Sequence, residues 1–332
     1  MKSDRFSYRA PWWLPGGNPQ TVWAALASRR HFGPPPRWKR SRWKTPDGDF
    51  IDVDQALHSS AQEAPLLVLF HGLEGSSASQ YAVAFADFSA AHGVAYAVPH
   101  FRGCSGELNH APRAYHSGDF QEIDWILRRF AEEHPGRPLI AVGVSLGGNA
   151  LMRWAGEMGT EATSCVRAIA SVCSPLDLAA GGHAIGRGFN RVVYTRMFMR
   201  SMVPKALGKL EQHPGLFDRQ KLLAARDLYE FDNLFTAPLH GFKDTTDYWA
   251  RASAKPVLHS IRVPALALNA RNDPFVPAES LPTQQDAGHH VTLWQPEQGR
   301  DVGFPVSYGP LGLPGHVRAM PEAVGNWLLA HL

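Results

Sequence analysis

The sequence predicts an α/β fold, with one mostly parallel sheet of about eight strands covered by helices on both faces. Three observations lead to this fold class. Short apolar runs alternate with helical segments along most of the chain. A Gly-x-Ser-x-Gly turn joins one of these runs to a helix at Ser145. The alternation stops at residues 174–258, where apolar clusters occur without a clear strand, and this interval predicts a helical lid inserted between two strands.

The chain accordingly divides into an N-terminal arm at residues 1–36, a core formed by residues 37–173 and 259–332, and the lid at 174–258. The arm is rich in Trp, Pro and Gly, and its one helical candidate is at 18–28. Two interpretations of the arm are open, of which we favour the first. It packs across the core, or it touches a membrane surface through Trp12, Trp13 and Trp23.

Turn signals and apolar periodicity place the elements of the core. Residues 37–44 and 50–57 alternate polar and apolar side chains around Pro46-Asp47-Gly48, which predicts a hairpin of half-exposed strands. The remaining strands are expected at 66–70, 94–98, 138–142, 166–172, 264–268 and 291–294. Core helices are expected at 81–92, 120–134 and 321–332, in addition to the helix that begins after Ser145.

Composition points to a folded, water-soluble enzyme. Of the 332 residues, 44% are apolar and 19% charged, and a net charge of +3 without a Lys/Arg run gives no reason to expect a nucleic-acid partner. The three cysteines lack metal-ligand spacing, which suits a reducing compartment. Neither a signal peptide nor a transmembrane segment is recognisable. We therefore expect a cytoplasmic protein without a metal or organic cofactor, for which peripheral membrane contact stays open.

The turn around Ser145 has the features of a nucleophile site. Glycines two residues on either side allow a strand to reverse tightly into a helix, which lifts the serine Oγ above the sheet edge. The backbone N–H of Leu146, at the start of that helix, would stabilise negative charge that develops on a substrate carbonyl. A second donor is expected in the loop after strand 66–70, His71-Gly72-Leu73, where we select the N–H of Leu73.

With these residues considered, the chain resembles the YheT-like branch of the α/β-hydrolase fold. The resemblance covers nearly the whole chain and includes strings more specific than the serine turn. These strings are Asn18-Pro19-Gln20-Thr21, His71-Gly72-Leu73-Glu74-Gly75-Ser76, Phe101-Arg102-Gly103-Cys104-Ser105-Gly106, Tyr115-His116-Ser117-Gly118, Gly143-Val144-Ser145-Leu146-Gly147-Gly148-Asn149, Ala237-Pro238-Leu239-His240-Gly241-Phe242 and Asn272-Asp273-Pro274-Phe275.

Members of this branch are regarded as carboxylesterases, and their eukaryotic relatives act on glycerolipids. The resemblance implies a Ser…Asp…His triad in that chain order, with Ser145 as nucleophile. Asp273 follows the strand after the lid, where the acid of such a triad belongs, and it would orient the imidazole of the base.

The chain departs from this pattern at the base. Where the branch has Gly-Gly-His-Val-Gly-Phe, this chain has Gly299-Arg300-Asp301-Val302-Gly303-Phe304. An aspartate with an ordinary pKa of about 3.9 cannot shuttle protons near neutral pH as imidazole does. Among the sixteen histidines, His316 lies in the loop between the last strand and the last helix, where this fold keeps its base. His71, His100 and His116 are also expected at the active end of the sheet.

The sequence thus predicts a serine hydrolase that cleaves small-molecule acyl esters through an acyl-enzyme on Ser145. Asp273 would be the acid, Leu73 and Leu146 would form the oxyanion hole, and His316 is a tentative base because the motif position is Asp301. Three interpretations of that position stay open: a rescuing histidine, a catalytically impaired or non-catalytic acyl-binding protein, or an alteration of the sequence. Lid residues such as Met197 and Phe198 would set chain-length preference.

Overall fold

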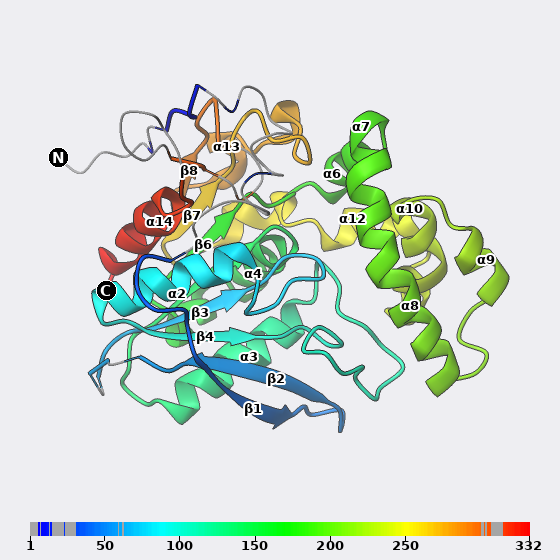
Figure 1. Ribbon diagram of the computed structural model, residues 1–332, viewed down its shortest axis with the longest axis horizontal. Helices are drawn as coiled ribbons and strands as arrows, with labels where there is room; N and C mark the ends of the chain where they lie inside the picture. The colour runs from blue at the N-terminus through cyan, green and yellow to red at the C-terminus, as the bar shows by residue number, and fades with distance from the viewer. Residues whose placement is uncertain are drawn as a thin grey trace.

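The computed structural model describes residues 6, 8–12, 14, 23, 31–58, 60–61, 63–299, 302, 304–306 and 315–332. Within these residues, eight strands form one sheet in the order β1-β2-β4-β3-β5-β6-β7-β8 (Figure 1). They are β1 (Trp38–Lys44), β2 (Phe50–Ala56), β3 (Leu66–Phe70), β4 (Ala95–Pro99), β5 (Leu139–Val144), β6 (Ala168–Val172), β7 (Ala265–Leu268) and β8 (Val291–Trp294). β2 pairs antiparallel with β1 and β4, and the other pairs are parallel, which confirms the predicted fold class.

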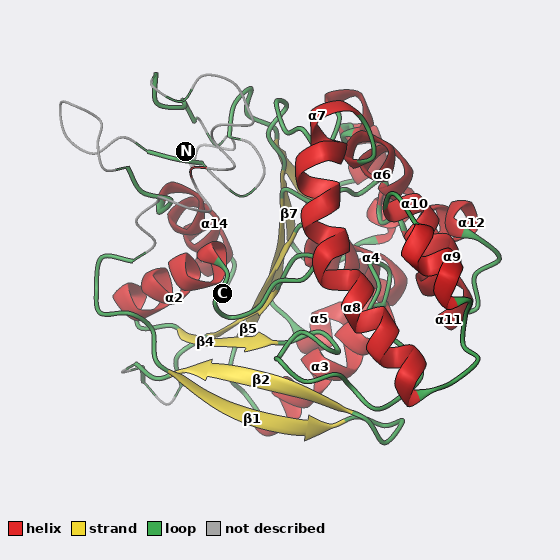
Figure 2. Cartoon of the chain, turned by 45° about the vertical axis from the view of Figure 1, so that its right-hand side comes forward, coloured by secondary structure: helices red, strands yellow, loops and turns green. Residues whose placement is uncertain are grey.

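Two helical layers bury the apolar strands from both sides. Successive side chains of a strand point to opposite faces, so Leu67 of β3 packs in one layer and Val68 in the other. The first layer holds α2 (Gln80–His92) and α14 (Ala319–Leu329), and the second holds α3 (Phe120–Glu133), α4 (Leu146–Met158) and α5 (Ala162–Cys165). Figure 2 shows the two layers on either side of the twisted sheet. This double cover explains why the run at 66–70 is apolar without interruption.

The interval between β6 and β7 consists of helices that project from one end of the sheet (Figure 1). The helices are α6 (Leu178–Ile185), α7 (Gly188–Asn190), η2 (Arg191–Thr195), α8 (Arg196–Gln212), α9 (Arg219–Ala224), α10 (Leu228–Phe231), η3 (Asp232–Thr236), α11 (Ala237–Leu239), α12 (Thr245–Ala252) and η4 (Lys255–Ser260). Two apolar clusters of their own hold them together, one around Trp249 and one around Phe235. We refer to residues 174–258 as the lid.

The prediction of a half-exposed β2 was wrong. Residues Phe50 to Asp54 are all buried, because β2 lies between β1 and β4. Its polar positions are buried with partners: Arg42 Nε and Nη2 bind the two carboxylate oxygens of Asp52 at 2.8 and 2.9 Å. Asp54 accepts hydrogen bonds from Arg40 in the same way. The polar–apolar alternation therefore marks a buried ion-paired face rather than a solvated one.

Element boundaries differ from the predicted ones by a few residues at several places. The last helix begins at Ala319, ahead of Pro321, and ends at Leu329 rather than at 332. The strand expected from 166 begins at Ala168. The helix expected at 18–28 lies outside the described residues except for Trp23.

The described part of the arm includes one tryptophan that packs on the core and one that is exposed. Trp23 packs against Ala84 and Val317, whereas Trp12 is 85% exposed, and Trp13 lies outside the described residues. Across the described ranges, no helix has the length and apolarity that a membrane crossing requires.

Candidate active site

Ser145 occupies a strained turn between β5 and α4. Its φ of 52° and ψ of −119° lie in a region that residues with a Cβ rarely adopt. The flanking glycines are required by space: a Cβ on Gly143 would lie 2.4 Å from the carbonyl oxygen of Gly147, and one on Gly147 would lie 2.5 Å from that of His71. The Gly-x-Ser-x-Gly spacing therefore reflects a tight reversal that presents Ser145 at the carboxyl edge of the sheet.

Two backbone donors border Ser145. Leu146 is the first residue of α4, so its N–H has no partner within the helix. The loop after β3 lies directly against the serine, since a Cβ on Gly72 would be 3.2 Å from the Cβ of Ser145. Leu73 of this loop lines the same pocket as Ser145 and Leu146. The structure thus brings together three of the residues selected from the sequence.

His71 holds this loop in place. Its Nε2 accepts the N–H of Phe101 at 3.0 Å, so its Nδ1 carries the proton and donates to the carbonyl of Gly72 at 2.8 Å. The N–H of Gly72 in turn donates to the hydroxyl of Tyr81 at 2.9 Å. Complete burial lowers the pKa of His71 to about 3, which keeps the ring neutral. Both ring nitrogens are occupied, which makes His71 a positioning residue.

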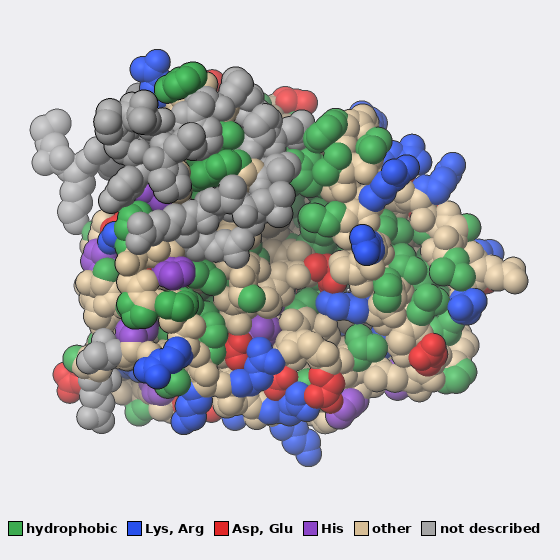
Figure 3. All heavy atoms as spheres, in the orientation of Figure 1, with side chains coloured by type: hydrophobic (Ala, Val, Ile, Leu, Met, Phe, Trp, Pro, Cys, Tyr) green, Lys and Arg blue, Asp and Glu red, His purple; other side chains and the backbone are tan. Residues whose placement is uncertain are grey.

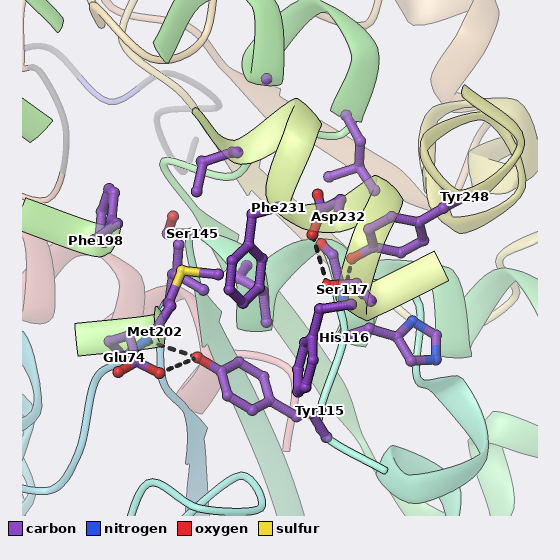
Figure 4. Close-up of a pocket in the computed structure, with 18 of the residues that line it drawn as sticks. Glu74, Tyr115, His116, Ser117, Ser145, Phe198, Met202, Phe231, Asp232 and Tyr248 are labelled. Carbon is purple, nitrogen blue, oxygen red and sulfur yellow. Dashed lines mark hydrogen bonds between the residues drawn. The ribbon is translucent and has the colours of Figure 1, made fainter. Parts of the chain in front are cut away.

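The next residue of the loop, Glu74, is fixed from three directions. It has a positive φ of 58°. Its N–H donates to the hydroxyl of Tyr115 at 2.9 Å, and the same hydroxyl donates to its Oε1 at 2.9 Å (Figure 4). Lys205 of α8 adds an ion pair to Oε2 at 2.8 Å. The conformation of the loop that carries Leu73 is therefore determined by Tyr115 of the core and Lys205 of the lid.

Glu74, Tyr115 and Lys205 are functional candidates that the sequence did not single out. Glu74 and Tyr115 occur in strings that carry the resemblance, which is the signal that could have drawn attention to them. No sequence signal identifies Lys205, because its contact depends on how α8 lies over the core.

A cavity of about 160 Å³ opens from Ser145 between the core and the lid. Its wall is mostly apolar, and Phe198, Met202 and Phe231 of the lid surround Ser145 in Figure 4. Asp232 is half-buried in the same wall, where its carboxylate accepts hydrogen bonds from Thr236 Oγ1 at 2.6 Å and Trp249 Nε1 at 2.9 Å. Burial raises the pKa of Asp232 to about 6. The site can therefore accept an apolar chain next to a nucleophile.

Asp273 follows β7, two strands away from β5 at the same edge of the sheet. It is buried, and its Oδ1 accepts the N–H of Phe275 at 2.8 Å. Phe275 lines the cavity, so Asp273 is hydrogen-bonded to a residue of the pocket wall. Position and burial suit a carboxylate that orients a base.

The tentative base, His316, has its described contacts outside this cavity. It forms an isolated β-bridge with Val306, and its ring packs edge-on against Phe32 with centroids 5.2 Å apart. Its Nδ1 accepts the N–H of Arg318 at 3.2 Å. His316 is not among the described residues that line the cavity around Ser145.

Val302, the residue that follows the motif position of the base, is the part of this motif that the structure places beside the site. Asp301, Arg300 and Gly303 lie outside the described residues. Val302 donates its N–H to the Sγ of Cys173 at 3.1 Å, and Cys173 lines the cavity. The chain at Val302 is thus anchored next to the pocket of Ser145.

The histidine that does line the cavity is His116, at its far side. In Figure 4 its ring points away from Ser145. The ring packs on His240 with centroids 4.5 Å apart, and its Nδ1 accepts the N–H of Gly118 at 3.2 Å. Burial lowers the pKa of His116 to about 3. His100 is also buried near the loop, where its Nε2 lies 2.9 Å from Asp54 Oδ2. These side chains organise the core rather than face the nucleophile.

No cluster of three His, Cys, Asp or Glu side chains in the described ranges is arranged to hold a metal ion.

Comparison with known proteins places the chain in a family. The family of the α/β hydrolase fold matches residues 65–304. The YheT protein of Escherichia coli (strain K12), an esterase by name, is 38% identical over 279 residues, or 83% of this chain and 81% of that protein. Phospholipase ABHD3 of Mus musculus is 27% identical over a region that covers 82% of this chain and 67% of that protein. The monoacylglycerol lipase of Saccharomyces cerevisiae is 28% identical over a region that covers 80% of this chain and 59% of that protein.

A solved structure with a similar fold agrees with the family match. The Pyrococcus furiosus esterase Pf2001 superposes with a TM-score of 0.52 at 13% identity, covering 89% of this chain and 90% of that one. The family match over most of the chain and the identity to YheT together show that the chain belongs to the YheT-like branch of the α/β-hydrolase fold.

Proposed function

We propose that this protein is a serine hydrolase that cleaves carboxylic esters through an acyl-enzyme on Ser145. The observation that carries the proposal is the strained serine at the start of α4, bordered by the Leu73 loop and open to an apolar cavity. The relatives named as an esterase, a phospholipase and a lipase support the same reaction class.

In this mechanism the Oγ of Ser145 attacks the ester carbonyl carbon, and its proton passes to a base. The N–H groups of Leu73 and Leu146 stabilise the oxyanion of the tetrahedral intermediate. The protonated base gives its proton to the leaving alkoxide, and the alcohol departs. Water then attacks the acyl-enzyme by the same route, which releases the carboxylic acid and restores Ser145. Asp273 orients the base and stabilises its cationic form.

The cavity indicates the class of acyl group. An engineered protein cavity of about 150 Å³ holds one benzene molecule, so a cavity of 160 Å³ suits a short or medium acyl chain. The head group of the ester would lie on the side of Glu74 and Lys205, an ion pair of the wall. A small glycerolipid or a short-chain acyl ester fits both parts. The three cysteines, all within described ranges, form no disulfide, and we propose a reducing, cytoplasmic location.

Covalent labelling should place an adduct on Ser145. Prolonged incubation of the chain with a fluorophosphonate, followed by peptide mass spectrometry, is expected to modify the peptide that contains Ser145. Labelling should be slow, because a serine without an imidazole partner is a weak nucleophile. A consistent adduct on another serine would contradict the assignment.

The lid should set the preference for acyl length. The structure separates two residues that the sequence treated alike: Phe198 lines the cavity, whereas Met197 is 55% exposed. Phe198→Ala enlarges the cavity, so the ratio of kcat/KM for long over short p-nitrophenyl esters is expected to rise by about tenfold. Met197→Ala is the matched control and should leave the ratio unchanged. An equal loss on every ester in Phe198→Ala would assign that residue to lid stability alone.

One observation favours a second function. Aspartate at position 301 removes the proton shuttle that the branch uses, while the pocket is kept. A catalytically impaired or non-catalytic protein that binds acyl ligands in this pocket is therefore the alternative proposal. The activity of variants at position 301 and at Ser145 distinguishes the two functions.

A further inference from the structure

One helix of the lid separates the cavity from the exterior. α7, η2 and α8 follow one another without a break from Gly188 to Gln212. The inner side of this helix lines the cavity through Phe198, Met202 and Lys205. Tyr194 continues the inner side and packs edge-on against Phe275, with ring centroids 4.6 Å apart. The opposite side of the helix faces outward.

The outward side carries an exposed apolar group. Phe189, Val192 and Met197 are each 55% exposed, and Val193 is 36% exposed. Nine large apolar side chains are exposed among the described residues, and four of them fall within residues 189–197. Val192 and Val193 lie three and four residues after Phe189, and Met197 lies four residues after Val193, spacings that place side chains along one side of a helix. An apolar group gathered in this way is typical of an interaction surface, whereas scattered exposed residues are ordinary.

The same side is strongly basic. Arg187, Arg191, Arg196 and Arg200 are exposed, and residues 178–210 contain no aspartate or glutamate. None of these four arginines forms an ion pair with a carboxylate of the described ranges. Several other arginines in or next to helices are paired with an acid four residues away, in Arg128–Asp124, Arg129–Glu133, Arg153–Glu157, Arg226–Glu230, Arg251–Asp247 and Arg318–Glu322. The absence of such pairs leaves the positive charge of Arg187, Arg196 and Arg200 available to an outside partner, whereas the charge of Arg191 also acts on Glu230 of the lid, whose pKa is lowered mainly by its hydrogen bond with Arg226.

We propose that this outward side, which we call the basic lid face (Phe189, Val192, Val193 and Met197 with Arg187, Arg196 and Arg200), docks on the surface of an anionic phospholipid bilayer. Apolar side chains at the headgroup boundary and arginines on lipid phosphates are the two contributions that hold a helix flat on a membrane. Figure 3 shows blue and green side chains intermixed over α7 and the start of α8.

The charge and apolarity of the basic lid face favour a lipid bilayer over a second copy of the chain or a nucleic acid. In a symmetric dimer the same patch would meet itself, which would bring arginines against arginines. A nucleic acid would satisfy the arginines but would leave the four apolar side chains without an apolar partner. A bilayer surface satisfies both. The helix that would touch the membrane also lines the cavity, so a lipid-derived ester would reach Ser145 through a short path. The docking itself does not depend on the proposed catalysis.

Vesicle binding tests the proposal without any activity measurement. The chain is mixed with vesicles of phosphatidylcholine alone, or with vesicles in which about a third of the lipid is phosphatidylglycerol, and bound protein is separated by flotation. We expect binding to the anionic vesicles that weakens with salt. Phe189→Ser with Met197→Ser, and separately Arg196→Gln with Arg200→Gln, should each lower the partition coefficient by about tenfold or more.

Matched controls lie on the core. Leu57→Ser removes a side chain that is 51% exposed, and Arg167→Gln removes an exposed charge just before β6, at the amino end of the sheet. Both should bind like the unmodified chain, and circular dichroism should show that all variants are folded. Equal partition of the lid variants and the unmodified chain overturns the proposal. Dimerisation in solution that the lid variants abolish, with no vesicle binding, also overturns it and assigns the face to a second copy.

Discussion

Replacing Arg300 by Gly together with Asp301 by His is expected to raise kcat/KM on a short-chain ester by about 10³-fold or more. The paired change restores the Gly-Gly-His-Val-Gly-Phe sequence of the branch at residues 299–304. In subtilisin, loss of the catalytic histidine lowers kcat by about 10⁶-fold, which sets the scale of what an imidazole supplies to a serine. Hydrolysis of p-nitrophenyl acetate and butyrate, followed at neutral pH, measures the gain.

The structure gives a reason why the restored histidine would reach the site. Val302 is held by its hydrogen bond to Cys173, whose side chain lines the cavity of Ser145. Asp273 is hydrogen-bonded to the N–H of Phe275, which lines the same cavity, and its carboxylate would accept a hydrogen bond from a ring N–H of the restored histidine. Arg300→Gly alone is the control, because it changes the motif without adding an imidazole. No gain in the double variant over this control would contradict the assignment of position 301 to the base.

His316 is the competing base, and it can be tested in the same assay. Its described contacts are with Val306, Phe32 and Arg318. If His316 serves as the base of the native chain, His316→Ala removes native activity while the restored motif adds little. The opposite pattern, a small effect of His316→Ala and a large gain from Asp301→His, assigns the native chain to the impaired class.

The features that the sequence predicted well are those that depend on neighbouring residues. The turn at Ser145 follows from local sterics, because Gly143 and Gly147 face backbone at distances that no Cβ tolerates. Continuous apolar runs identified the parallel strands for a similar reason, since burial on both faces excludes polar side chains.

The features that the sequence missed depend on contacts between distant segments. β2 appeared half-exposed because its aspartates look solvated until their arginine partners across the sheet are known. The role of Lys205 depends on the placement of α8 over the loop at Glu74, because Lys205 and Glu74 are 131 residues apart in the chain. The rotation of the same helix separates Phe198 in the cavity from Met197 outside it. No local pattern encodes that rotation, since both residues belong to one apolar cluster in the sequence.

Ser145→Ala is expected to have effects of very different size in the two backgrounds. In the chain with Arg300→Gly and Asp301→His, it should remove the whole gain, a loss of about 10³-fold or more. Catalytic serine and histidine act as one unit, so that removal of either costs about as much as removal of both. In the native chain, where the motif histidine is already absent, the same substitution should change kcat by a small factor. The remaining rate would come from the pocket and the backbone donors at Leu73 and Leu146.

Measuring Ser145→Ala in both backgrounds completes a double-mutant cycle that distinguishes an active esterase from a catalytically impaired protein. Steady-state rates of four proteins, the native and the restored chain each with and without Ser145→Ala, give the coupling between the nucleophile and the base. Strong coupling in the restored background and none in the native one shows a complete site that lacks its proton shuttle. A large loss on Ser145→Ala in the native chain shows instead that another group already activates the serine, and His316→Ala then identifies whether that group is His316. Equal, small effects in both backgrounds would contradict Ser145 as the nucleophile, because a restored base has nothing else at this turn to activate.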